Sequence, residues 1–142
     1  MYYLLCDPTT YSKLRDELDA HYGGPEEVDD WKKLMDLPYL FGTVHEGLRL
    51  GTPMAGPPRV VPDGGIVIDG TYVPEKAIVG VPPCVQQTSS DNFYPYPLEF
   101  RPEKWQPEGL GPDTVTRAQA LLCFSFGKYF LDTQLRNSLL MR

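Results

Sequence analysis

The chain of 142 residues is long enough for one modest domain, and we treat residues 1–142 as a single domain. Its 15 prolines and 13 glycines favour many turns and few long regular elements. The net charge of −6, without a basic stripe, argues against nucleic-acid binding. The N-terminal apolar run is too short for a signal peptide or a membrane span, so we expect a cytoplasmic protein.

Three cysteines, Cys6, Cys84 and Cys123, lie far apart in the sequence and form no CxxC pair. Only His21 and His45 could join them as metal ligands, which gives a zinc site little support. We therefore expect no metal site, and cysteines that stay reduced and act as small apolar side chains.

The first third of the chain predicts three helices. Asp-Pro at 7–8 is an N-cap followed by the first helical position, apolar residues then recur at helical spacing, and two glycines at 23–24 end the run. Residues 25–37 begin with acidic side chains and continue with two lysines, the charge order that a short helix prefers. A third helix is expected over residues 38–50 because apolar residues again recur on one face.

The middle of the chain changes to short β-branched runs separated by Pro and Gly, from residue 51 to 83. Asp69-Gly70 is a strong two-residue hairpin signal, and we expect several short strands in one small sheet. After Pro83 the chain becomes irregular and aromatic, and residues 135–142 predict a short terminal helix. The expected fold class is α+β, with a few helices packed on a small antiparallel β-sheet and a long irregular meander.

Four motifs occur in a characteristic order: an ExxR pair at Glu46 and Arg49, the hairpin "DGTYVP", the segment "FRPEKW" and the start of a loop, "FSFG". ExxR alone occurs often by chance, but the four together are specific. Over nearly its whole length the chain therefore resembles the C-terminal part of a cytochrome P-450, a haem-thiolate monooxygenase, of the type common in fungal secondary metabolism. The resemblance implies a truncated domain of that fold.

The loop that begins at Phe124 departs from the family pattern FxxGxRxCxG, in which the cysteine thiolate binds the haem iron. Phe124 and Gly127 match, but Tyr129 replaces the arginine, Leu131 the cysteine and Thr133 the final glycine. The family's acid–alcohol pair for oxygen activation would precede Met1. We therefore expect a haem-free protein without a cofactor, and no monooxygenation.

The ExxR pair has a third partner in the family, an arginine whose place is taken here by Lys104. Lysine keeps the charge but lacks the planar fork of arginine. We expect Glu46, Arg49 and Lys104 to form a partly buried structural network that fixes the helix to the meander. The alternative for Glu46 and Arg49 is a surface ion pair that contributes little.

Three functions remain open for such a chain: an inactive remnant, a binding module for an apolar metabolite or a partner protein, and a cofactor-independent cyclase. A cyclase of the Diels–Alderase type needs only to hold a hydrophobic terpenoid or polyketide near its reactive geometry, with one hydrogen-bond donor. We place this function slightly ahead of the non-catalytic binding or partner-stabilising module. Since part of a larger core would expose apolar surface, we also expect a homodimer.

The resemblance places candidate substrate residues on the loop after the ExxR helix and on the segment after the strands. Arg59 could bind a carboxylate or polarise a carbonyl, although a surface arginine is about equally expected, and Tyr129 could donate its hydroxyl. The other candidates for substrate binding are Thr52, Met54, Cys84, Gln86, Gln87 and Leu131. We expect His45 to be structural, and the aromatic residues from Phe93 onward to lie mostly in the core.

Overall fold

The computed structural model describes residues 2–24, 31–52, 56 and 58–123. The altered loop with Tyr129 and Leu131, the expected terminal helix and Met54 all lie outside these residues. Helices come first: α1 (Tyr2–Cys6), α2 (Pro8–His21), α3 (Trp31–Met35) and α4 (Pro38–Leu50). In the described part of the chain, no helix is both long and apolar enough to cross a membrane.

The first long helix, α2, begins where the sequence predicts. The Asp7 carboxylate accepts hydrogen bonds from the backbone N–H groups of Thr9 and Thr10 at 3.0 and 3.3 Å, and from the Thr10 hydroxyl at 2.6 Å. These bonds, chiefly the one from the hydroxyl, hold the pKa of Asp7 below its usual range. The prediction of a capped helix that ends before residues 23–24 is confirmed.

The start of α4 is capped by another helix. Its own N-cap residue, Leu37, has no side chain that can accept a hydrogen bond. The carboxylate of Glu17 on α2 accepts instead from the backbone N–H groups of Tyr39 and Leu40, both at 2.8 Å. A carboxylate at this end also suits the helix dipole. The Glu17 side chain therefore pairs two backbone N–H groups at the start of α4 and joins this helix to α2.

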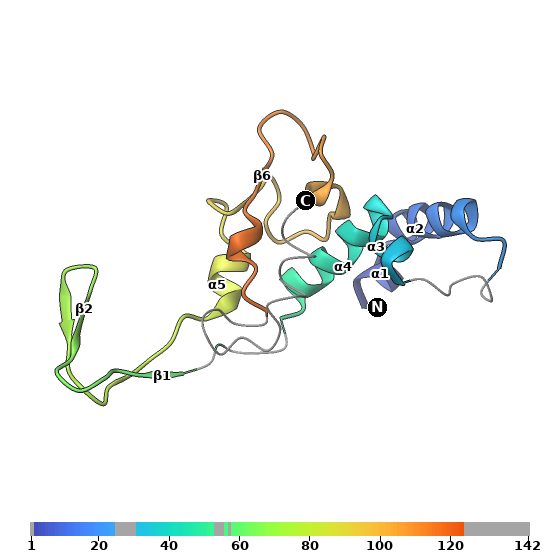
Figure 1. Cartoon of the computed structure of the whole chain (residues 1–142). Coiled ribbons are helices and arrows are strands. Elements are labelled where there is room, and N and C mark those ends of the chain that lie inside the picture. Colours follow the sequence, from blue (N-terminus) through green and yellow to red (C-terminus); the bar gives the residue numbers. More distant parts are fainter. Residues whose placement is uncertain (1, 25–30, 53–55, 57, 124–142) are drawn as a thin grey trace.

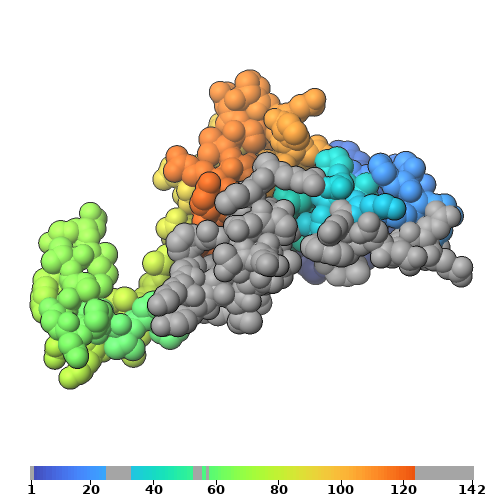
Figure 2. Space-filling model, viewed as in Figure 1, coloured from blue at the N-terminus to red at the C-terminus, as the bar shows by residue number. Residues whose placement is uncertain are grey.

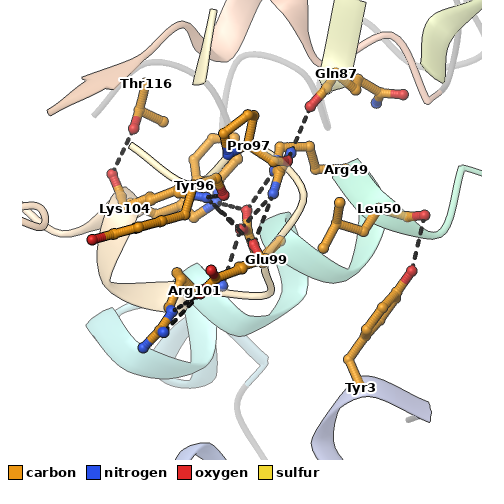
Figure 3. A network of polar contacts seen from close by, with 12 residues as sticks. Tyr3, Arg49, Leu50, Gln87, Tyr96, Pro97, Glu99, Arg101, Lys104 and Thr116 are labelled. Atoms are coloured by element: carbon orange, nitrogen blue, oxygen red, sulfur yellow. Dashed lines mark hydrogen bonds and ion pairs between the residues drawn. The ribbon is translucent and has the colours of Figure 1, made fainter. Parts of the chain in front are cut away.

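The other end of α4 is held by α1. Tyr3 donates its hydroxyl to the Leu50 carbonyl at 3.2 Å (Figure 3). Its ring also stacks on Phe100, with ring centroids 5.1 Å apart. On the side of the meander, the backbone of Pro102 approaches Gly42 so closely that a Cβ there would overlap its carbonyl oxygen. Helix α4 is thus the element around which the described chain assembles.

The predicted hairpin is present between β2 (Ile66–Ile68) and β3 (Thr71–Val73). Asp69 and Gly70 both have positive φ, 47° and 77°, as a tight two-residue turn requires. β1 (Arg59–Val60) pairs with β4 (Ile78–Val79).

The expectation of one small sheet is wrong, because these ladders are separate two-stranded sheets. Pro62 and Pro74 follow β1 and β3, and turns there interrupt the pairing. We call residues 59–79 the β arm. Figures 1 and 2 show its hairpin end standing away from the helices.

The segment after Pro83 contains more regular structure than expected. It forms α5 (Pro83–Gln87), β5 (Phe93–Tyr94), a 3₁₀ turn η2 (Pro102–Trp105), β6 (Val115–Thr116) and η3 (Ala118–Ala120). β5 pairs with β6, so chain segments on both sides of η2 meet. Phe93 is fully buried, as expected, but Tyr94 and Tyr96 are 48% and 56% exposed and do not belong to the core.

The core of the described residues is small and unusually polar. Its buried apolar side chains are Leu14, Leu37, Tyr39, Val61, Phe93 and Cys123. Buried polar and charged residues are slightly more numerous: Thr10, Thr43, His45, Glu46, Arg49, Gln87 and Lys104. Such groups cost free energy unless they are paired, so their pairing decides whether this fold is stable.

Replacing Glu17 by alanine should lower the free energy of unfolding by about 1–2 kcal/mol, because α4 loses its only carboxylate cap. Urea unfolding followed by circular dichroism measures this. Asp19→Ala is the matched control on the same helix, since Asp19 pairs with Arg15 at 3.3 Å in an exposed position. Its expected effect is within about 0.5 kcal/mol. Equal effects of the two substitutions would contradict the capping role.

Candidate functional site

The carboxylate of Glu46 lies at the centre of the described residues and is completely buried. It accepts hydrogen bonds from Arg49 Nη2 and Nε at 2.7 and 2.8 Å, and from Trp105 Nε1 at 2.9 Å. The backbone N–H of Arg101 and the ammonium of Lys104 donate to it at 3.1 and 3.5 Å. A carboxylate offers about four lone-pair positions, so these donors leave Glu46 no place for a substrate proton.

Arg49 is also buried and uses every N–H of its guanidinium. Besides its two bonds to Glu46, it donates through Nη1 to the carbonyls of Gln87 and Pro97 at 2.6 and 2.5 Å. Nη2 donates to the Glu99 carbonyl at 3.1 Å. Figure 3 shows how the loop before η2 wraps around the end of the side chain. Arg49 thereby holds α4, α5 and the meander together.

Lys104, on η2, approaches the same carboxylate and is 2% exposed. Its ammonium donates to the Tyr96 carbonyl at 2.5 Å, to the Glu99 carbonyl at 3.3 Å and to Glu46 at 3.5 Å. Burial lowers the pKa of Lys104 below its ordinary value of 10.5, and the Glu46 charge offsets part of this. The three ammonium hydrogens of Lys104 thus each have an acceptor, and this arrangement does not require the planar guanidinium of an arginine.

The structure therefore brings Glu46, Arg49 and Lys104 together, and we call these three residues the charge network. The two ion pairs measure 2.7 Å and 3.5 Å, and all three side chains are fully buried. A surface ion pair, the alternative from the sequence, does not describe Glu46 and Arg49. Two buried cations share one carboxylate, so backbone carbonyls accept the hydrogen bonds that the carboxylate cannot accept.

Aromatic rings enclose the charge network. The guanidinium carbon of Arg49 lies 5.0 Å from the ring centre of Phe93. His45 packs between Phe41 and Trp105, with ring centroids 3.9 and 4.8 Å away, and its Nδ1 bonds the Phe41 carbonyl at 2.8 Å. Since the acceptor is a carbonyl, Nδ1 carries the proton. These contacts give His45 a packing role.

Two buried side-chain atoms in the described residues have no hydrogen-bond partner: Thr43 Oγ1 and Gln87 Nε2. Gln87 is completely buried, and its Oε1 accepts from the hydroxyl of Thr52. Its backbone carbonyl accepts from Arg49. The amide nitrogen of Gln87 is thus an unused donor next to a fully used charge network.

Among the substrate candidates that lie in the described residues, Thr52 and Gln87 are in contact. Gln86 accepts from Asn92 Nδ2 through its carbonyl and its Oε1 at 2.9 and 3.1 Å, which makes it part of a local turn. Cys84 on α5 and Arg59 on β1 are exposed. A hollow of about 520 Å³ is lined by residues between Lys104 and Thr116, and its lining includes none of the substrate candidates that the structure describes.

Sequence reasoning missed several groups that complete the site. The carbonyls of Tyr96, Pro97 and Glu99 could not be found, because every residue carries a carbonyl and only the fold directs it. The role of Trp105 could have been predicted in principle, because the N–H of a buried tryptophan needs an acceptor. Glu46 of the ExxR motif is that acceptor.

Comparison with known proteins gives the family. The Cytochrome P450 family model matches residues 1–129. Cytochrome P450 monooxygenase aba2 of Botryotinia fuckeliana is 38% identical over 126 residues, which cover 78% of this chain and 24% of that protein. Cytochrome P450 monooxygenase mpaDE of Penicillium roqueforti is 38% identical over 133 residues, 90% of this chain and 15% of the relative. The chain belongs to the cytochrome P450 family.

A third relative, cytochrome P450 monooxygenase cloA of Claviceps purpurea, is 36% identical over 129 residues, 89% of this chain and 24% of its own length. The chain therefore spans about a quarter or less of the curated relatives it matches. The match to fungal monooxygenases confirms the resemblance, and the helices and small antiparallel ladders confirm the P450-like α+β class.

The family implies a haem held by an axial thiolate, and the residues of this chain do not fit that group. The family match ends at residue 129, and the order of the motifs in the sequence places Leu131, which has no lone pair to donate, at the ligand position. Cys123 precedes the position by eight residues and is 2% exposed. Among the described residues, no three His, Cys, Asp or Glu side chains are grouped so as to hold a metal ion.

Glu46→Gln should lower the free energy of unfolding by about 3–5 kcal/mol, because it leaves two buried cations without their carboxylate. The urea midpoint provides the measurement. Glu99→Gln is the matched control: the Glu99 side chain pairs with Arg101 at 2.7 Å with about half of each side chain exposed. We expect that substitution to cost less than about 1 kcal/mol. A small effect at Glu46 would show that the charge network does not hold the fold.

The lowered pKa of Lys104 predicts a pH dependence. As the pH rises through the folded-state pKa toward 10.5, the folded protein loses this proton while the unfolded chain keeps it. The unfolded state then binds more protons, so Lys104 makes the free energy of unfolding rise with pH in that window. Lys104→Arg, which stays protonated, should lack this rise. Urea unfolding at several pH values measures this. The assignment would be contradicted if the free energy of unfolding changed with pH in the same way in both proteins.

Proposed function

We propose that the chain acts as a haem-free binding module of the cytochrome P450 family, and that it binds a protein partner without catalysing a reaction. The observation that carries this proposal is the exposed apolar surface of the β arm. Val60 and Val67 are each 66% exposed, Tyr72 is 61% exposed and Ile78 is 72% exposed. Exposed apolar side chains also occur elsewhere, for example Tyr2, Leu5 and Leu98, but those of the β arm form cross-strand pairs. Apolar patches of this kind mark interaction sites.

The interior supports the same function. Every N–H of Arg49 and every hydrogen of Lys104 already has an acceptor within the protein. A group in this condition stabilises the fold and has no free hydrogen with which to bind or activate a substrate. We therefore place the function of the chain on its surface.

A cofactor-independent cyclase is the second candidate, and one observation favours it. The buried amide nitrogen of Gln87 is an unpaired donor beside Thr52, and a pericyclic closure needs orientation and one donor to a carbonyl. The substrate would be a hydrophobic terpenoid or polyketide intermediate. The exposure of Arg59 weakens this candidate, because a cyclase would need it inside an enclosed site.

Incubation with a linear polyene that carries a carbonyl dienophile separates the two functions. For a binding module, the rate and the isomer ratio should equal those of the uncatalysed control. For a cyclase, the protein should accelerate closure, Gln87→Met should remove most of the acceleration, and Gln86→Met should keep it. Acceleration with this pattern would overturn the non-catalytic proposal.

Partner binding has its own test. Sedimentation velocity of the purified chain, alone over a range of concentrations and with a full-length cytochrome P450, should reveal assemblies of more than one polypeptide. An apolar fluorescent dye should bind the free chain and be displaced on assembly. A monomer in every mixture that also binds no dye would contradict the proposal.

A further inference from the structure

We propose that Glu103, Lys13 and Tyr39 form an acid-released joint, which holds the two long helices to η2 and opens separately from the charge network. We call these three residues the outer joint. The inference concerns contacts inside the described chain and does not depend on the proposed binding function. It follows from the elements that meet at one carboxylate oxygen, from the protonation of the groups around it and from their exposure.

The carboxylate of Glu103 joins three elements at a single oxygen atom. Its Oε1 accepts from Lys13 Nζ on α2 at 2.8 Å and from the Tyr39 hydroxyl on α4 at 3.2 Å. The Lys13 ammonium also lies 5.9 Å from the centre of the Tyr39 ring. Because these residues are far apart in the sequence, their bonds fix how α2 and the start of α4 meet η2.

The outer joint and the charge network extend from η2 to different places. Glu103 and Lys104 are neighbours in the chain, but their side chains diverge. Lys104 reaches Glu46 in the middle of α4, whereas Glu103 reaches Tyr39 in the first turn of that helix. The side chains of the charge network are completely buried, while that of Glu103 is 20% exposed and that of Lys13 is 53% exposed. The outer joint is therefore a part of this packing that a proton can reach without opening the core.

The groups around Oε1 hold the protons that this arrangement requires. Burial raises the pKa of Tyr39 to about 12, and the Glu103 charge acts in the same direction, so the hydroxyl remains a donor. Burial also raises the pKa of Glu103, but hydrogen bonds, above all the one from Lys13, outweigh this effect and hold its pKa below the ordinary value of 4.5. At neutral pH Glu103 is thus an anion that accepts both bonds.

Other charged groups lie near the outer joint and bear on its pH dependence. Arg101, just before η2, pairs with a neighbouring carboxylate at 2.7 Å, and its charge also acts on Glu103. Asp7 caps α2 and Glu17 caps α4 by accepting backbone N–H groups. The pKa of Asp7 is lowered too, chiefly by the hydrogen bond from Thr10. A test must therefore separate the effect of acid on Glu103 from its effect on these carboxylates.

Acid removes the anion on which the outer joint depends. Since the pKa of Glu103 is lower in the folded protein than in the unfolded chain, the joint is fully formed above the unfolded value of 4.5 and is lost as the pH falls through the folded-state pKa. A neutral Glu103 no longer attracts the Lys13 ammonium. We expect α2 to loosen from η2 in acid, while the second half of α4 stays held by Arg49.

Hydrogen exchange of backbone amides, followed by NMR, tests the joint. Glu103→Gln keeps the size of the side chain but removes its charge, and it should lower the protection factors of α2 about tenfold near neutral pH and those of residues 45–50 less than twofold. Lys13→Met should lower the protection of α2 in the same way. Arg15→Met is the matched control on α2, because Arg15 pairs with Asp19 at 3.3 Å in an exposed position, and should change protection less than about twofold.

The pH dependence of the same measurement tests the release by acid. As the pH falls from about 6 to about 3.5, the α2 protection factors of the unmodified chain should approach those of Glu103→Gln, because Glu103 becomes neutral. Asp7 and Glu17 are present in both proteins, so their titration does not create this convergence.

Each contrary outcome removes part of the proposal. A difference between the two proteins that stays constant with pH would overturn the release by acid. Equal losses of protection in α2 and in residues 45–50 would overturn a separate joint, because the described chain would then open as one unit. Unchanged α2 protection in both Glu103→Gln and Lys13→Met would overturn the contact as a support of α2.

Discussion

The buried ion pair between Glu46 and Arg49 is the interaction on which the rest of this structure depends. Burying a carboxylate and a guanidinium costs several kcal/mol for each ion, and their attraction repays this only when every remaining hydrogen-bonding group is satisfied. Here that requirement is met by carbonyls from α5 and from the meander, and by the indole of Trp105. The pair therefore dictates where segments distant in sequence must lie.

Much of the fold was predictable because its signals are local. The Asp7-Pro8 cap and the Asp69-Gly70 turn each act through bonds within a few residues, so sequence order is enough to place them. The partition into separate ladders and the β5–β6 pair were missed, since they depend on where turns direct the chain. Glu17 shows the same limit: it caps a helix 22 residues away, which no local pattern encodes.

The candidate site divides in the same way. The ExxR spacing places Glu46 and Arg49 on one face of a helix, and the resemblance to the family implied that Lys104 joins them. Contacts to an organic substrate have no comparable rule. Thr52 and Gln87 are in contact, whereas Cys84 and Arg59 are exposed. A resemblance identifies corresponding positions in a sequence, but it does not show which side chains line a cavity.

The charge network and the loop that follows Cys123 obey separate constraints. Among the described residues, the donors to Glu46 are Arg49, Lys104, Trp105 and the backbone N–H of Arg101, all before residue 106. The described bonds of this centre therefore involve no residue of the loop that follows Cys123. Most buried polar groups of the described residues are paired, with Thr43 Oγ1 and Gln87 Nε2 as the exceptions. Exposed apolar side chains are then what the protein offers to other molecules, and those of the β arm carry the case for binding over catalysis.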